Sequence, residues 1–218
     1  MQVSLVNLGK REGAFRVAAV SGLTTGIAAN APVFSMRWNP ASSPYQEGMV
    51  RFCVIQRLRA KWRTITGFTA AQEIGLAAYV ARSFTVADSG GTALTLTTTN
   101  AQKRTGVPPG TAGVTTGGMP TTQATINIAT TGTLTAGTRT LDAQPFAEEV
   151  FADLAAAATV PKGRFEAEFV NQDQPGFPLV LSPQEGIVIQ NVIAQGAAGT
   201  ARIIVEVDWL EVARVVGG

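Results

Sequence analysis

The sequence predicts an all-β fold: an antiparallel β-sandwich, jelly-roll-like, with one or two short helices at most. Among its 218 residues are 23 glycines and 11 prolines, which favour turns over long helices. Apolar and polar residues alternate in many short segments, which is the period of a strand with one buried face. Turn residues separate these segments at frequent intervals, as is typical of sandwiches and barrels.

The strongest alternation lies near the C-terminus. Residues 201–212 place apolar side chains on one face and acids on the other: Ile203, Val205, Val207 and Trp209 against Glu206 and Asp208. A second apolar segment, 179–192, precedes it, and the small residues 195–199 join the two. Such a link is too short for a helical crossover, so we expect the two segments to pair as an antiparallel hairpin.

The rest of the chain divides into an expected N-terminal arm, residues 1–13, and a single sandwich domain, residues 14–218. Further strands are expected at residues 14–20, 31–38, 50–65, 92–98, 125–128, 131–141 and 165–169. Residues 100–120 are rich in Gly, Pro and Thr and predict a long loop. Loops of that length in compact domains are either functional or mobile.

Residues 69–84 fit both a helix and a strand. Their alanines favour a helix, whereas the alternation of Ile74, Leu76 and Ala78 favours a strand, and Gly75 would weaken a helix. We favour the strand.

A helix is predicted at residues 145–158. Phe146, Val150 and Leu154 are spaced four apart, and the acidic residues near the start complement the helix dipole.

Composition excludes several functions. The chain has no histidine, which removes Ser-His and Cys-His nucleophile pairs and His-based metal sites. Its one cysteine, Cys53, cannot form an intrachain disulfide and is expected to be buried packing. A net charge of +2 is too small to indicate direct nucleic-acid contact. No signal peptide or membrane-spanning run is present, so a soluble protein made in a reducing cytoplasm is expected. We expect no enzymatic activity, cofactor or metal.

A basic stripe is the sharpest local feature. It consists of Arg57, Arg59, Lys61 and Arg63. Apolar residues of the same segment lie at even positions: Val50, Phe52, Val54, Leu58 and Trp62. On a strand these charges lie about 7 Å apart on one face. They could contact phosphate or an acidic protein surface. Alternatively they form a solvated outer face, countered by Glu166 and Glu168 on a neighbouring strand.

Three other groups of residues suggest a function or a structural role. Asp88-Ser89-Gly90 has the form of an aspartic-protease motif, but the following Gly91-Thr92 favours an exposed hairpin turn. Glu206, Asp208 and Glu211 could hold calcium, although strand carboxylates more often face solvent. The tryptophans are expected in the core or an interface: Trp38, Trp62 and Trp209.

Several phrases together resemble a family of small structural proteins of tailed bacteriophage virions. They are residues 81–85, 88–92, 134–142, 178–181 with Glu185-Gly186, and 205–209, within a match over residues 50–212. The resemblance implies a capsid decoration (cement) protein that binds the major capsid protein, often as a homotrimer. It would lie on the capsid surface after synthesis in the host bacterial cytoplasm. The family offers no catalytic residues.

Contact surfaces are expected on the arm, the long loop and the basic stripe. The residues are Val3 and Leu5, Val107 and Met119, and Arg57, Arg59, Lys61 and Arg63. The alternative is a tail- or fibre-associated protein with a receptor- or carbohydrate-binding role. That role would use exposed aromatics, such as Trp38 or Tyr45, beside carboxylates.

Overall fold

Strands, and no helix, make up the regular structure of the residues that the computed structural model describes: 10–40, 49–96, 122–153, 161–168 and 178–215. They form two antiparallel sheets. Sheet A contains β1 (Lys10–Val20), β12 (Thr200–Val215), β3 (Met49–Thr66), β10 (Leu179–Leu181) and β9 (Pro161–Glu168). Sheet B contains β5 (Thr92–Ala93), β6 (Ala124–Ile128), β2 (Ala31–Trp38), β11 (Glu185–Asn191), β4 (Gln72–Arg82), β7 (Thr140–Leu141) and β8 (Ala147–Asp153).

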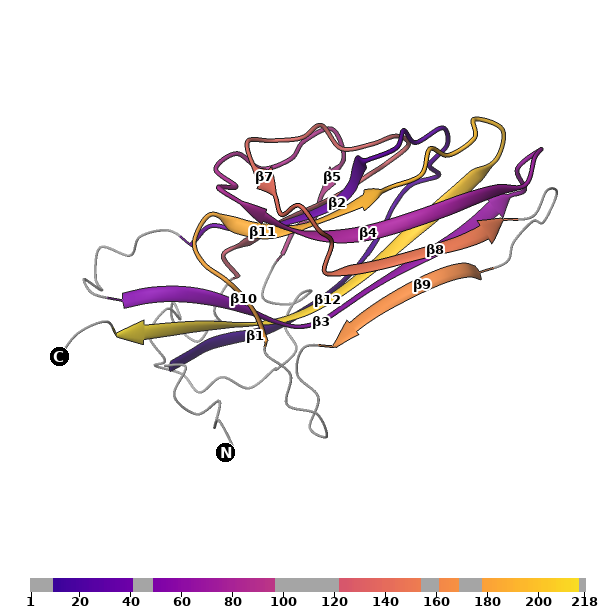
Figure 1. Cartoon of the computed structure of the whole chain (residues 1–218). Coiled ribbons are helices and arrows are strands. Elements are labelled where there is room, and N and C mark those ends of the chain that lie inside the picture. The colour runs from indigo at the N-terminus through magenta and orange to yellow at the C-terminus, as the bar shows by residue number, and fades with distance from the viewer. Residues whose placement is uncertain (1–9, 41–48, 97–121, 154–160, 169–177, 216–218) are drawn as a thin grey trace.

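The connectivity of the eight longest strands is that of a jelly roll. Strands β1, β12, β3 and β9 are successive neighbours in sheet A, and β2, β11, β4 and β8 are successive neighbours in sheet B. The chain therefore passes repeatedly between the sheets, and each sheet is built from strands far apart in sequence. Figure 1 shows the two layers, with β2, β11 and β4 above β1, β12 and β3. The predicted fold class is confirmed.

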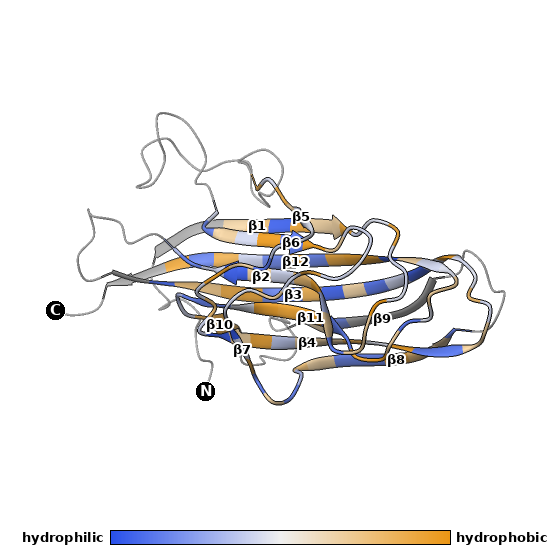
Figure 2. Ribbon diagram, turned by 90° about the horizontal axis from the view of Figure 1, so that it is seen from above, coloured by the Kyte–Doolittle hydropathy of each residue, from blue (hydrophilic) through white to orange (hydrophobic). Residues whose placement is uncertain are grey.

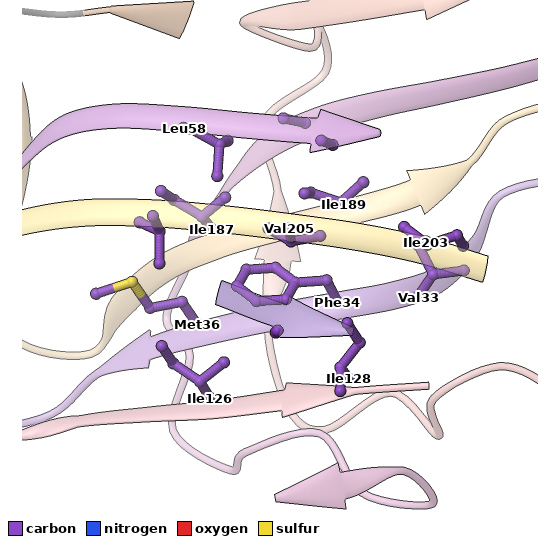
Figure 3. Packing of buried hydrophobic residues seen from close by; sticks show 14 of the residues in the cluster. Val33, Phe34, Met36, Leu58, Ile126, Ile128, Ile187, Ile189, Ile203 and Val205 are labelled. Atoms are coloured by element: carbon purple, nitrogen blue, oxygen red, sulfur yellow. The ribbon is translucent and has the colours of Figure 1, made fainter. Parts of the chain in front are cut away.

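The core lies between the two sheets. Figure 3 shows Leu58 of β3 and Val205 of β12 facing Phe34 of β2 and Ile187 of β11, all fully buried. Along the long strands hydrophilic and hydrophobic segments alternate (Figure 2), which places one side of each strand in the core and the other outside. A core truncation such as Leu58→Ala would cost about 2–5 kcal/mol.

The predicted C-terminal hairpin is wrong. Residues 179–192 contain two strands, β10 in sheet A and β11 in sheet B. The turn between them has Gln184 in the left-handed region, with a φ of 64°. Strand β11 pairs with β2 and β4, whereas β12 pairs with β1 and β3. The short link between them crosses from one sheet to the other, because the apolar faces of β11 and β12 are buried against each other across the core.

A β-bulge in β3 changes which residues face the core. In the pairing of β3 with β12, Arg57 lies opposite Asp208 and Ile55 opposite Trp209, so Gln56 has no partner. The extra residue reverses the alternation. Cys53 and Ile55, rather than the predicted Phe52 and Val54, therefore join Leu58 in the core cluster, although Val54 is also buried.

The two segments with helical spacing are both strands. Residues 72–82 form β4, as favoured from their alternation, with β11 on one side and β8 on the other. The predicted helix at 145–158 is wrong, because residues 147–153 form β8, and residues 154–158 lie outside the described part. Val150, placed on the buried helical stripe by its spacing, is 47% exposed on this edge strand.

The other expected boundaries differ in part. Strand β1 begins at Lys10, so the last residues of the expected arm, 10–13, pair with β12. Strands β2 and β6 match expectation closely, while residues 131–141 contribute only β7 and a bridge between Ser89 and Thr135. The division into an arm and one domain stays a prediction.

Candidate functional site

The basic stripe lies on the outer face of sheet A, and most of it is paired with acids of the neighbouring strand. Burial of Leu58, Ala60 and Trp62 turns the odd-numbered cations outward. Three contacts bind the stripe to β12: Arg57 to Asp208 at 3.2 Å, Arg59 to Glu206 at 3.2 Å and Lys61 to Glu206 at 3.0 Å. The hydrogen bond from Lys61, with Arg59 and Arg57 nearby, lowers the pKa of Glu206 despite partial burial.

Two further strands complete this charge network. Glu166 of β9 contacts Arg59 and lies 3.8 Å from Arg57. Arg16 of β1 lies 3.3 Å from Asp208 and 3.9 Å from Glu206. The predicted countercharge from Glu166 is thus present, and Glu168 lies in register with Arg57. A partner that used these cations would have to compete with pairs that the fold already makes.

Arg63 differs from the rest of the stripe. It is exposed and lies directly opposite Arg202, another exposed residue, in the pairing of β3 with β12. Neither guanidinium has an ion pair or hydrogen bond with the described residues. Arg63 is therefore the member of the stripe that remains available to a partner. Arg202 was not singled out in the sequence, although its even-numbered position in the alternation of residues 201–212 already placed it on the outer face.

The remaining predicted contact residues, Val3, Leu5, Val107 and Met119, lie outside the described residues, and so does Tyr45. Their roles stay predictions. Trp38 is described and is fully buried, which removes it as an exposed platform for a carbohydrate.

The other two tryptophans also belong to the core. Trp209 stacks on Phe15 with ring centroids 5.4 Å apart, and Trp62 donates from Nε1 to the Thr64 hydroxyl at 3.3 Å. The Thr64 hydroxyl in turn donates to the buried carboxylate of Asp153. These side chains hold the sandwich together.

Asp88 is buried in a structural ion pair. Its carboxylate accepts a hydrogen bond from the Gly137 amide at 2.8 Å and another from the Arg139 guanidinium. Arg139 lies 5.3 Å from the centroid of the Phe84 ring, and burial lowers the pKa of this guanidinium. Ser89 and Gly90 are exposed, as predicted for a turn, but Asp88 itself is buried. A carboxylate held by a cation does not share a proton with a second carboxylate, as an aspartic-protease pair does.

The three acids considered for calcium lie on two different faces of β12. Glu206 and Asp208 point outward into the charge network, whereas Glu211 is buried on the side of Trp209. Glu211 accepts hydrogen bonds from the Trp209 Nε1 at 3.1 Å, the Gln123 amide at 3.2 Å and the Thr122 hydroxyl. It ties the start of the β6 segment to sheet A. Its odd-numbered position, shared with Trp209, was the signal in the sequence for its inward direction.

Cys53 lies opposite Glu211 in the pairing of β3 with β12 and is fully buried, as predicted. Burial, and secondly the Glu211 charge, raises the pKa of its thiol well above the ordinary value. Within the described ranges no three Cys, Asp or Glu side chains gather as metal ligands. That part of the chain also holds no helix long and apolar enough to cross a membrane.

Comparisons with known proteins give limited information. No protein-family model and no curated protein matches the chain. Among solved structures, it is similar to VP1 of Trichodysplasia spinulosa-associated polyomavirus in complex with GM1 oligosaccharide, with 8% identity, 93% of this chain and 94% of that chain covered, and a TM-score of 0.31. It is also similar to a chain of a Merkel cell polyomavirus virus-like particle, with 8% identity and a TM-score of 0.28. The match covers 88% of this chain and 64% of that chain. At these values no function is transferred from either protein.

Proposed function

We propose that this chain is a non-enzymatic structural protein of a virion, and specifically a decoration protein that binds the major capsid protein of a bacteriophage head. The observation that carries the proposal is the jelly-roll connectivity of eight strands, an architecture common among viral capsid and lectin domains. Because one fold serves many functions, the surface must decide between such roles.

The described residues favour a structural role over two alternative functions, sugar binding and catalysis. A sugar-binding role would use an exposed aromatic, yet Trp38 is buried. An enzyme with histidine-bound metal is excluded because the chain has no histidine. The acid that resembled a catalytic motif, Asp88, holds Arg139 and Gly137 in place. The phrases that resemble phage structural proteins support the same assignment.

Capsid contacts are assigned to the N-terminal arm and the long loop. Arg57, Arg59 and Lys61 serve instead to join β3, β12 and β9, since their charges are already paired. Three copies of a modest contact would act together if the protein is a homotrimer.

Particles that lack the protein provide the test. Purified protein is added to them, and bound density is located by cryo-electron microscopy. Symmetric occupancy of the head lattice is expected, with the major capsid protein as the partner. Density confined to the tail would replace decoration by the tail or fibre role, and absence of binding would contradict a virion role on that particle.

Two variants sharpen this experiment. Deleting residues 2–9 removes none of the described strands, and Val107→Ser with Met119→Ser alters only the long loop. Each is expected to reduce occupancy on the particle without changing the midpoint of unfolding. Val86→Ser is the matched control, because Val86 is an exposed valine elsewhere, at 55% exposure. Equal occupancy of all variants would refute the assigned contact surfaces.

A further inference from the structure

Among the described residues, the exposed charges that have no ion pair are positive on sheet A and negative on sheet B. On sheet A, Arg63 and Arg202 are exposed and have no ion pair with the described residues. On sheet B, the exposed carboxylates without ion pairs in the described part are Glu73, Glu148 and Glu149. Arg82, in contrast, pairs with Asp142 and Glu185, and the half-buried Arg37 donates to the Phe84 carbonyl. The uncompensated positive and negative charges therefore lie in different places on one chain.

The arginines belong to a patch that also carries exposed apolar side chains. Ile204, the next outward residue after Arg202 on β12, lies in register with Val20 of β1, which is 50% exposed. Leu23, 41% exposed, lies between the backbone contacts that Ser21 and Thr24 make with residues 203 and 201. We define the basic patch as Arg63, Arg202, Val20, Leu23 and Ile204.

The basic patch is electrostatically unfavourable in the isolated chain. Arg63 and Arg202 are directly opposite across an antiparallel pair, where side chains start about 5 Å apart and like charges repel. The nearby acids, Glu206 and Asp208, are already shared among four cations. An external acidic group would therefore relieve a repulsion that the fold leaves uncompensated.

The glutamates belong to a patch of similar design on sheet B. In the pairing of β4 with β8, Glu73 lies opposite Ala152, Gly75 opposite Val150, and Ala77 opposite Glu148. Ile74 and Leu76 face the core, so Glu73, Glu148 and Val150 share the outer face. A Cβ on Gly75 would lie 2.5 Å from Val192 Cγ2, which places this half-buried valine on the same face. Glu149 lies opposite Leu76 and so on the other face of the sheet. We define the acidic patch as Glu73, Glu148, Val150 and Val192.

The two patches match in charge and in apolar character. Of the four large apolar side chains that are exposed in the described part, Val20 and Leu23 lie in the basic patch and Val150 lies in the acidic patch. Opposite charges around exposed valines are the composition expected of complementary halves of one interface. The outer faces of the two sheets point in opposite directions (Figure 1), so one chain cannot join its own patches.

We propose that the basic patch of one copy of this chain binds the acidic patch of a second copy. Such a contact is heterologous, since each copy uses a different surface, and it generates a ring if the rotation closes. A ring of three copies would give the trimer expected from the sequence resemblance. The proposal does not depend on the virion role, because it concerns the purified chain alone.

Charge reversal tests the proposal in solution. Sedimentation velocity and native mass spectrometry of the full chain should show concentration-dependent association that high salt weakens. The double variants Arg63→Glu/Arg202→Glu and Glu73→Lys/Glu148→Lys should each weaken it by at least about tenfold. An equimolar mixture should associate again, because one variant carries acids on both faces and the other carries bases on both.

Uncharged substitutions test whether a loss of association comes from the patches themselves and not from a change in folding caused by charge reversal. Val20→Asn and Val150→Asn should weaken association, whereas Val86→Asn, at an exposed valine outside both patches, should not. A wild-type chain that stays monomeric, reversed variants that associate like wild type, or a mixture that does not associate would each overturn the proposal. Loss of binding to duplex DNA on reversing Arg63 and Arg202, with unchanged mass, would overturn it in favour of a polyanion site.

Discussion

Replacing Arg139 by methionine tests whether Asp88 serves the fold. Methionine keeps an unbranched stem but removes the guanidinium, which leaves the Gly137 amide as the remaining donor to the fully buried Asp88 carboxylate among the described residues. Removing one partner of a buried pair typically costs about 3–5 kcal/mol. The lost contact with the Phe84 ring adds to this, while the retained amide bond reduces it. We expect a loss of about 3–4 kcal/mol.

A double-mutant cycle separates the pair from other effects. In Asp88→Asn the amide oxygen can still accept from Gly137, but the Arg139 guanidinium is left buried without its countercharge. The double variant removes both charges, so its loss of stability should be smaller than the sum of the single losses by about 1–3 kcal/mol. Urea unfolding followed by tryptophan fluorescence measures all four proteins, because the three tryptophans are buried.

A cost below about 1 kcal/mol for Arg139→Met would refute this reasoning, as would additive single losses. Either result would mean that the ion pair is hydrated in solution and does not hold the segment around Asp88 against the segment that contains Gly137 and Arg139. Asp88 would then be free for another role, and the aspartic-hydrolase hypothesis would need a direct assay of cleavage with Asp88→Asn.

Three further predictions concern single sites. The Lys61 hydrogen bond lowers the pKa of Glu206 in the folded protein, so the charged Glu206 stabilises the fold above the ordinary pKa of 4.5, and this stabilisation is lost as the pH falls below that value. Glu206→Gln should therefore cost up to about 1 kcal/mol at pH 7 and nothing in strong acid, as measured by urea unfolding at a series of pH values. Gly186→Ala should cost about 1–3 kcal/mol, since its Cβ would lie 2.2 Å from a backbone oxygen, whereas Gly132→Ala, with nothing within 4 Å, should stay near neutral in thermal melts. The Cys53 thiol should react with a thiol reagent only at the rate of unfolding, and rapid labelling of the native protein would contradict its burial.

Local patterns in the sequence predicted the strands that are buried on one face. The expected segment 31–38 coincides with β2, and the alternation of residues 201–212 correctly divided β12 into a core face and an outer face. The same alternation places the odd-numbered Glu211 on the buried face of Trp209, contrary to the solvent-facing position expected for strand carboxylates. The predicted helix at 145–158 failed because edge strand β8 exposes Val150 and so lacks a clear period of two.

The amino-acid sequence by itself determined the fold class and the direction of most side chains, because the period of two is a local property of the extended backbone. Only the tertiary structure decided which strands are neighbours, since burial of β11 against β12 across the core outweighed their short connection. The tertiary structure also decided which of the basic side chains are paired with acids. The acids of β12 and β9 neutralise Arg57, Arg59 and Lys61, and leave Arg63 opposite Arg202. Countercharges come from strands distant in the chain, so no local spacing could reveal them.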